Sequence, residues 1–207
     1  MRTKIDASRL LRPGLLEGVS LLLGGASRSG EDAPGSFANA AGAACEELGA
    51  TVAAWPGEAG VEIASVDVLV VDASGLYPHE GEDEAVGGLD TPRDALRVCL
   101  QSAWELTGEV VNTAFLPAAR AGRIIYLAPA PGGEPSKLAQ HADAARAGLE
   151  NLARTLSIEW ARHRITALTI APGVETSAGE VAALTAYLAS PAGAYFSGCL
   201  LDLRGPS

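Results

Sequence analysis

Tyr126, His141 and Arg146 are the side chains of the central region that could serve proton transfer or charge stabilisation on a bound molecule. Ser136 lies between Tyr126 and His141 in the sequence, and both Ser136 and Tyr126 could take part only if the surrounding loops were rearranged. Such a set would suit a reaction on a carbonyl or thioester compound, because proton transfer by a positioned side chain is a common source of catalysis. An enzyme built on these residues is one hypothesis for this chain.

The sequence favours neither a metal site nor a disulfide framework. The segment from Tyr77 to Glu84 combines one histidine with scattered acids and several glycines, which is typical of a solvated loop rather than a metal site. Cys45, Cys99 and Cys199 are odd in number, far apart and embedded in apolar runs. They are predicted to be buried small hydrophobic residues in a reducing cytosol, so we expect neither a metal ion nor a disulfide framework.

The composition is that of a globular protein, with 48% hydrophobic and 19% charged residues. A length of 207 residues suits one core, and we expect a single domain over residues 1–207. The net charge of −10 disfavours binding to nucleic acid or to an anionic membrane surface. The apolar run of 18–25 is too short for a signal peptide or a membrane span, so a cytoplasmic location is expected.

Apolar runs and helical segments alternate along the chain, which predicts an α/β fold with a parallel sheet covered on both faces. Strands are expected at 19–23, 51–55, 67–72, 123–127, 165–170 and 198–203. Helices are expected at 36–48, 94–119, 139–161 and 179–188.

The segment from Arg146 to Gly173 resembles the signature helix and following strand of the short-chain dehydrogenase/reductase family, including the Ala-Gly-Leu after position 146 and the terminal Pro-Gly. The segments 67–74, 180–190 and 195–205 are similar to other conserved parts of that family. The resemblance implies a Rossmann-like, doubly wound parallel sheet in three layers. It also makes the family's catalytic positions the ones to inspect.

The resemblance places four catalytic positions on residues that cannot perform the family's chemistry. The tyrosine position is Ala142 and the lysine position is Arg146, which keeps the charge but not the compact ammonium. The serine position falls on Pro129, and the asparagine position falls near Trp104. His141 is adjacent to Ala142, but neighbouring helix residues point about 100° apart, so it is not expected to replace the tyrosine. We therefore predict no catalytic residues in this chain.

The resemblance also implies a damaged cofactor loop. The segment from Gly25 to Gly30 resembles the start of the family's glycine-rich loop, in which the backbone approaches a pyrophosphate at a helix N-terminus. Glu31 and Asp32 then add negative charge where a diphosphate would lie, and like charges there oppose binding. We expect no cofactor and no cofactor-binding residues in this chain.

Two segments are shorter than the resemblance requires. Trp55 and Pro56 stand near the position of the family's ribose-binding acid, and only residues 55–66 precede Asp67. Because a strand–helix–strand unit needs about 30 residues, one strand–helix unit is predicted to be missing. Only 174–178 separate the Pro-Gly from the next helix, where active members carry a helical substrate lid, so this lid is predicted to be missing.

The long helices near 94–119 and 139–161 correspond, by the resemblance, to the four-helix interface through which family members pair. The resulting hypothesis is a non-catalytic subunit of a hetero-oligomer, which stabilises or shapes an active NAD(P)-dependent homologue. The alternatives are a divergent oxidoreductase with a rebuilt active site and a binding or regulatory module without a redox role.

Overall fold

A computed structural model describes residues 6–25, 37–56, 65–75, 92–131 and 137–204. These residues contain one sheet of six parallel strands in the order β2-β1-β3-β4-β5-β6. The strands are β1 (Ser20–Gly24), β2 (Thr51–Ala54), β3 (Val68–Asp72), β4 (Gly122–Leu127), β5 (Ile165–Ala171) and β6 (Leu200–Asp202). The predicted Rossmann-like α/β fold is confirmed.

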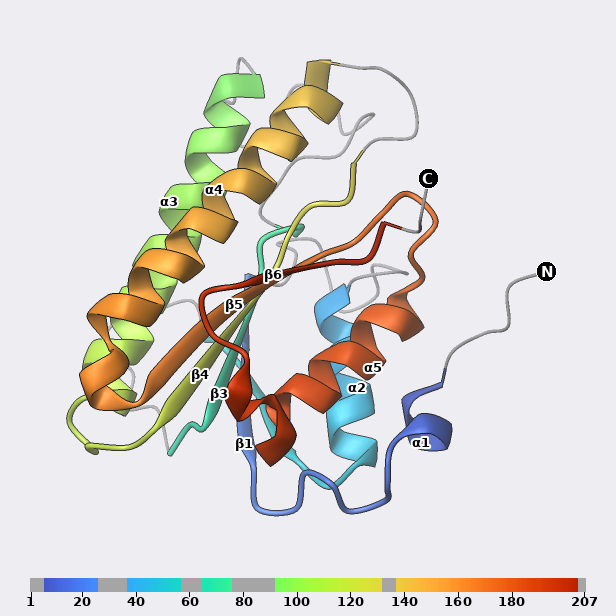
Figure 1. The fold of residues 1–207 in the computed structure, drawn as a ribbon, viewed down its shortest axis with the longest axis vertical. Helices are drawn as coiled ribbons and strands as arrows, with labels where there is room; N and C mark the ends of the chain where they lie inside the picture. Colours follow the sequence, from blue (N-terminus) through green and yellow to red (C-terminus); the bar gives the residue numbers. More distant parts are fainter. Residues whose placement is uncertain (1–5, 26–36, 57–64, 76–91, 132–136, 205–207) are drawn as a thin grey trace.

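Helices cover both faces of the sheet and make three layers (Figure 1). One face carries α3 (Pro92–Val110) and α4 (Lys137–Glu159), and the other carries α2 (Phe37–Glu47) and α5 (Ala178–Ala189). Alternate residues of a strand enter different cores: Val71 packs under α3 and α4, whereas Val70 packs under α2 and α5. The central strands are buried on both sides, which explains their unbroken apolar runs.

The observed ends of the elements differ from the predicted ends by a few residues. The long helix predicted to reach Ala119 is α-helical only to Val110 and continues as one π-helical turn, Val111–Phe115. The signature helix ends at Glu159, followed by a short 3₁₀ turn that closes with Arg164 in the left-handed conformation. A further short helix, α1 (Ala7–Leu10), was not predicted; Asp6 caps it by accepting a hydrogen bond from Ser8 N.

The sheet differs from a full doubly wound sheet at β2. Among the described residues β2 pairs only with β1, and most of its side chains are exposed. The prediction of a missing strand–helix unit after β2 concerns mainly residues 57–64, which lie outside the described residues. The order of the strands reverses between β1 and β3, and in open α/β sheets the crevice at such a reversal, at the carboxyl ends of the strands, is the usual ligand site.

The predicted absence of a lid helix after β5 is confirmed. The segment 172–177 joins β5 to α5 without any helix. Thr176 Oγ1 accepts a hydrogen bond from Gly173 N (2.8 Å) and donates one to Leu203 O (3.1 Å), so the connection is tied to the end of β6. Ser177 then begins α5 with a capping box shared with Glu180.

The small residues of α4 divide between its two faces. Ala145 and Ala153 are buried in the core with Leu149 and Leu156, so they belong to the side that faces the sheet. Ala144 and Ala147 are exposed, so only these two of the four alanines lie on the side of α4 that faces away from the sheet. None of the helices in the described ranges is long and apolar enough to cross a membrane.

Candidate functional site

The carboxyl ends of β4, β5 and β6 meet beside the first half of α4. This edge belongs to the carboxyl side of the sheet, the side on which doubly wound sheets hold their ligands. Ala142 and Arg146, one helical turn apart on α4, face this edge and are both buried. Ala142 offers only a methyl group there, so the arrangement has no proton donor at the position that the family resemblance gives to tyrosine.

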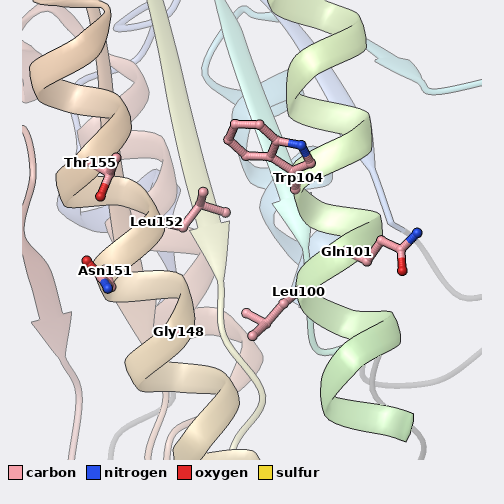
Figure 2. A pocket seen from close by; sticks show the side chains of 7 residues that line it. All are labelled: Leu100, Gln101, Trp104, Gly148, Asn151, Leu152 and Thr155. Atoms are coloured by element: carbon pink, nitrogen blue, oxygen red, sulfur yellow. The ribbon is translucent and has the colours of Figure 1, made fainter.

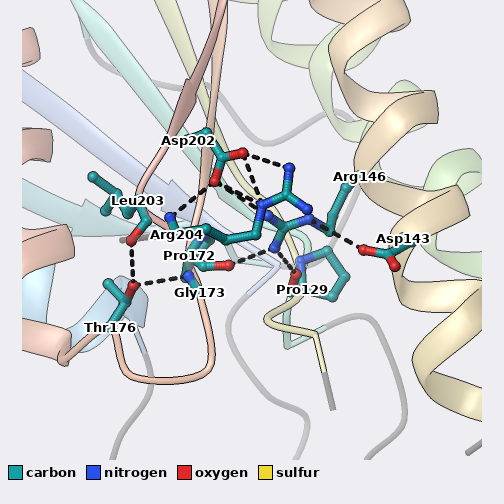
Figure 3. A network of polar contacts seen from close by, with 9 residues as sticks. All are labelled: Pro129, Asp143, Arg146, Pro172, Gly173, Thr176, Asp202, Leu203 and Arg204. Atoms are coloured by element: carbon teal, nitrogen blue, oxygen red, sulfur yellow. Dashed lines mark hydrogen bonds and ion pairs between the residues drawn. The ribbon is translucent and has the colours of Figure 1, made fainter. Parts of the chain in front are cut away.

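Arg146 fills this edge with its own hydrogen bonds (Figure 3). Its Nη1 donates to Pro129 O (3.1 Å), just beyond β4, and to Pro172 O, directly after β5. Only 5% of its side-chain surface is exposed. A guanidinium that ties together two strand ends in this way holds the sheet, and Nη1 has no direction left toward a bound molecule.

Arg146 also belongs to an ionic group, called here the Arg146 cluster and made of Asp143, Arg146, Asp202 and Arg204. Arg146 Nη2 lies 3.7 Å from Asp202 Oδ1, and Arg146 Nε lies 3.8 Å from Asp143 Oδ1. Arg204 Nη2 contacts Asp202 Oδ2 at 2.5 Å. The two positive and two negative charges balance inside the cluster, which gives it no net attraction for a charged ligand.

The pKa values of the cluster follow from these contacts. Burial lowers the pKa of Arg146, and the neighbouring Arg204 lowers it further, against the opposite effects of Asp202 and Asp143. The hydrogen bonds from Arg204 hold the pKa of Asp202 below its usual value. Neither Asp202 nor Arg204 was predicted. The signal in the sequence was an Asp-x-Arg at the end of the last strand, which parallel strands bring to the same edge as Arg146.

Pro129, at the position that the resemblance gives to the catalytic serine, is buried and contributes only its backbone oxygen. It therefore supplies an acceptor to Arg146 and no side-chain hydroxyl for a substrate. The serine position thus takes part in holding the strand ends together.

The other predicted candidates do not meet at this edge. Tyr126 is fully buried under α3, where its hydroxyl lies 2.9 Å from Thr107 Oγ1. Burial raises the pKa of Tyr126 above its usual value, so this phenol cannot serve as an accessible proton donor. His141 is half-buried on α4 beside Ala142, and Ser136 lies outside the described residues.

Trp104 does not lie at this edge of the sheet either. Its side chain is 49% exposed and lines a groove between α3 and α4, away from the sheet. The buried residues of α3 at this level are Cys99 and Ala103, and Cys99 Sγ lies 3.5 Å from Ala73 O. The residue near the predicted asparagine position therefore faces away from the sheet.

The predicted cofactor and metal segments are described only in part. Gly25 follows β1 with a positive φ of 74°, and the rest of the glycine-rich loop, with Glu31 and Asp32, lies outside the described residues. Trp55 is half-buried against the core at the end of β2. The segment 77–84 is also outside the described part, and within that part no group of His, Cys, Asp and Glu is placed to hold a metal ion.

A second feature, called here the outer helix face, is a groove of about 450 Å³ between α3 and α4 (Figure 2). Its lining residues are all uncharged: Leu100, Gln101, Trp104, Gly148, Asn151, Leu152 and Thr155. Trp104 and Leu100 extend from α3 and Leu152 from α4 into the space between the helices. Gly148 allows the close approach, because a Cβ there would lie 2.8 Å from the Leu100 side chain.

The fold is similar to solved dehydrogenases. A citronellol catabolism dehydrogenase of Pseudomonas aeruginosa PAO1 superposes with a TM-score of 0.67 at 19% identity, covering 94% of this chain and 96% of that one. A hydroxysteroid dehydrogenase from Escherichia coli superposes with a TM-score of 0.62 at 15% identity, covering 94% and 99% of the two chains. These similarities concern the fold alone.

Sequence comparison gives the family. No curated protein sequence matches the chain. The family model for short chain dehydrogenases matches residues 47–185, which is more than half of the chain. The matched region contains β3, β4, β5 and both long helices, and therefore Arg146 with the ends of β4 and β5. The chain therefore belongs to the short-chain dehydrogenase/reductase family.

Proposed function

We propose that this chain is a non-catalytic subunit of a hetero-oligomeric short-chain dehydrogenase/reductase. In this proposal it carries no NAD(P) and performs no hydride transfer. It binds an active, NAD(P)-dependent homologue through the outer helix face and stabilises that subunit or shapes its substrate entrance.

The observation that carries the proposal is how Arg146 is hydrogen-bonded at the ends of the strands. The reaction of the family needs a proton donor near the carboxyl ends of β4 and β5, and Ala142 supplies none. Arg146 Nη1 donates hydrogen bonds to Pro129 O and Pro172 O, so this region holds the ends of the strands together. Catalytic residues that act as a group lose most of their effect when one of them is removed, and here the group is replaced as a whole.

The outer helix face supports the choice of partner. In a chain with 19% charged residues, the groove between two long helices is lined only by uncharged side chains. Depletion of charge and an exposed tryptophan are typical of the centre of a protein interface. A second pair of long helices, as an active homologue carries, has the shape that fits such a face, because helices pack with their side chains in the grooves of a neighbouring pair.

The test is assembly with a defined partner. The chain is co-expressed with a full-length short-chain reductase encoded nearby, and the mass and composition of the complex are measured by native mass spectrometry. Trp104→Glu is expected to weaken the complex at least about tenfold, because it places a charge at the centre of the face.

Leu10→Glu is the matched control. Leu10 is also an exposed apolar residue (63% exposed), but α1 packs beside α5 and α2 on the opposite side of the sheet. This variant should assemble with an affinity within about twofold of the original chain, as expected for a position outside an interface. A chain that stays a monodisperse monomer beside the reductase contradicts the proposal, as does equal loss of affinity in both variants.

A further inference from the structure

The crevice between the carboxyl ends of β1 and β3 contains a buried carboxylate. Asp72 is the last residue of β3 and is almost completely inaccessible to solvent. Its Oδ2 accepts a hydrogen bond from Ala38 N at 3.1 Å, and its Oδ1 accepts from Gly75 N at 3.1 Å and from Ser74 Oγ. The carboxylate therefore connects β3 with the beginning of α2.

Ala38 lies in the first turn of α2, an 11-residue helix whose own first turn contains no acidic residue. The first four N–H groups of a helix have no partner within the helix, and the helix dipole favours a negative charge beside them. In this chain the charge comes from another element, across the reversal of strand order. Asp72 thus stands where an anionic ligand of a doubly wound sheet would meet the helix.

The backbone also packs closely at this point. Gly25, with a φ of 74°, follows β1, and a Cβ added there would lie only 2.7 Å from Asp72 O. β1 and β3 are paired neighbours up to Gly24 and Val71, so the close contact shows that the chain leaves β1 directly against the end of β3, where only a glycine fits. The negative charge of Asp72 beside the first turn of α2 opposes entry of a phosphate group.

We propose that Asp72 is an internal anionic partner of the α2 N-terminus, which occupies the N–H of Ala38 and by its charge opposes binding of a nucleotide diphosphate there. The helix then needs no cofactor for its stability. This inference is independent of the proposed partner, because a subunit that binds a reductase could still keep an open diphosphate site. If either the proposed partner or the proposed role of Asp72 is refuted, the other is unaffected.

The experiment is rescue by an added anion. Urea unfolding of the original chain, Asp72→Ala and Val70→Ala is measured with sodium pyrophosphate or with sodium chloride at equal ionic strength. Val70 is the matched control, since it is buried in the same strand and carries no charge. Asp72→Ala is expected to lower the folding equilibrium constant about 5- to 30-fold, as loss of a helix-capping carboxylate does.

Pyrophosphate should then restore stability to Asp72→Ala in a saturable way and leave the original chain and Val70→Ala unchanged relative to chloride. Equal recovery in both variants, or none in Asp72→Ala, overturns the proposal. If Asp72→Ala does not fold, Asp72→Asn carries the test: calorimetric titration should show tighter binding of pyrophosphate than to the original chain. Equal binding to both would show that the carboxylate does not oppose binding of the anion.

Discussion

Replacing Arg146 by methionine should destabilise the fold, because the structure uses this side chain to hold strand ends together. The change removes the donor from two buried carbonyl oxygens, Pro129 O and Pro172 O. Each buried acceptor without a partner costs about 1–3 kcal/mol. Asp202 remains paired with Arg204, and Asp143 is largely exposed, so neither carboxylate adds much to the loss.

One effect acts in the opposite direction. Arg146 is a buried charge whose Nη2 makes no hydrogen bond within the described residues, and removing it recovers part of that burial cost. We therefore expect a net loss of about 2–3 kcal/mol, which lowers Tm by about 5–10 °C for a chain of this size. Arg146→Lys keeps the charge but not the planar group, so its loss should be smaller, about 1–2 kcal/mol.

The assay is urea unfolding followed by circular dichroism, with Arg154→Met as the matched control. Arg154 lies on the same helix, but its side chain is 60% exposed and pairs with Glu150 on the surface. Its replacement should change stability by no more than about 0.5 kcal/mol. If Arg146→Met is as stable as the original chain, or more stable, Arg146 does not hold the strand ends and the reasoning is wrong.

The charges and the thiols give two further predictions. Because Arg204 lowers the pKa of Asp202, the carboxylate stabilises the fold above its unfolded pKa of about 3.9 and loses that effect as the pH falls through its lower folded pKa. Urea midpoints should therefore fall more steeply below about pH 4 in the original chain than in Arg204→Ala, and parallel curves would argue against the pair. Burial raises the pKa of Cys45 and Cys99 to about 12, whereas Cys199 is only half-buried. In the folded chain at neutral pH a thiol reagent should label Cys199 first, and the other two only after denaturation; equal rates for all three would refute this.

The sheet and its helices could be predicted because each element carries its own local signal. The apolar runs of β3 and β4 are buried on both faces, and such runs distinguish a central parallel strand from a surface strand. The ends of the helices were not predicted to the residue, since the π-helical turn at Val111–Phe115 depends on packing rather than on a capping residue. For the short helix α1, the capping aspartate was the only signal in the sequence.

The site could be predicted only as a set of positions. Spacing identified Ala142, Arg146 and Pro129, and all three lie at one edge of the sheet. Spacing did not give the direction of a side chain on α3: an error of one residue turns a helix position by about 100°, and Trp104 faces outward. The partners of Arg146 could not be predicted either, because Pro172 and Asp202 come from strands far along the chain.

Asp72 illustrates a different limit. The sequence segment 67–74 indicated a strand and its family resemblance, but a carboxylate at a strand end is usually solvated. Its burial depends on α2 beginning directly above it, which requires the strand order to reverse between β1 and β3. That reversal is a property of the whole sheet, and no local pattern contains it.

The most direct test of the non-catalytic role is the activity of the purified chain alone. NADH and NADPH are titrated calorimetrically, and their oxidation is followed with a panel of ketones and aldehydes. The account predicts no saturable binding of either nucleotide and no turnover above a blank without protein. Saturable binding together with turnover that Arg146→Met abolishes would contradict it, because a residue engaged in holding strand ends would then also be catalytic.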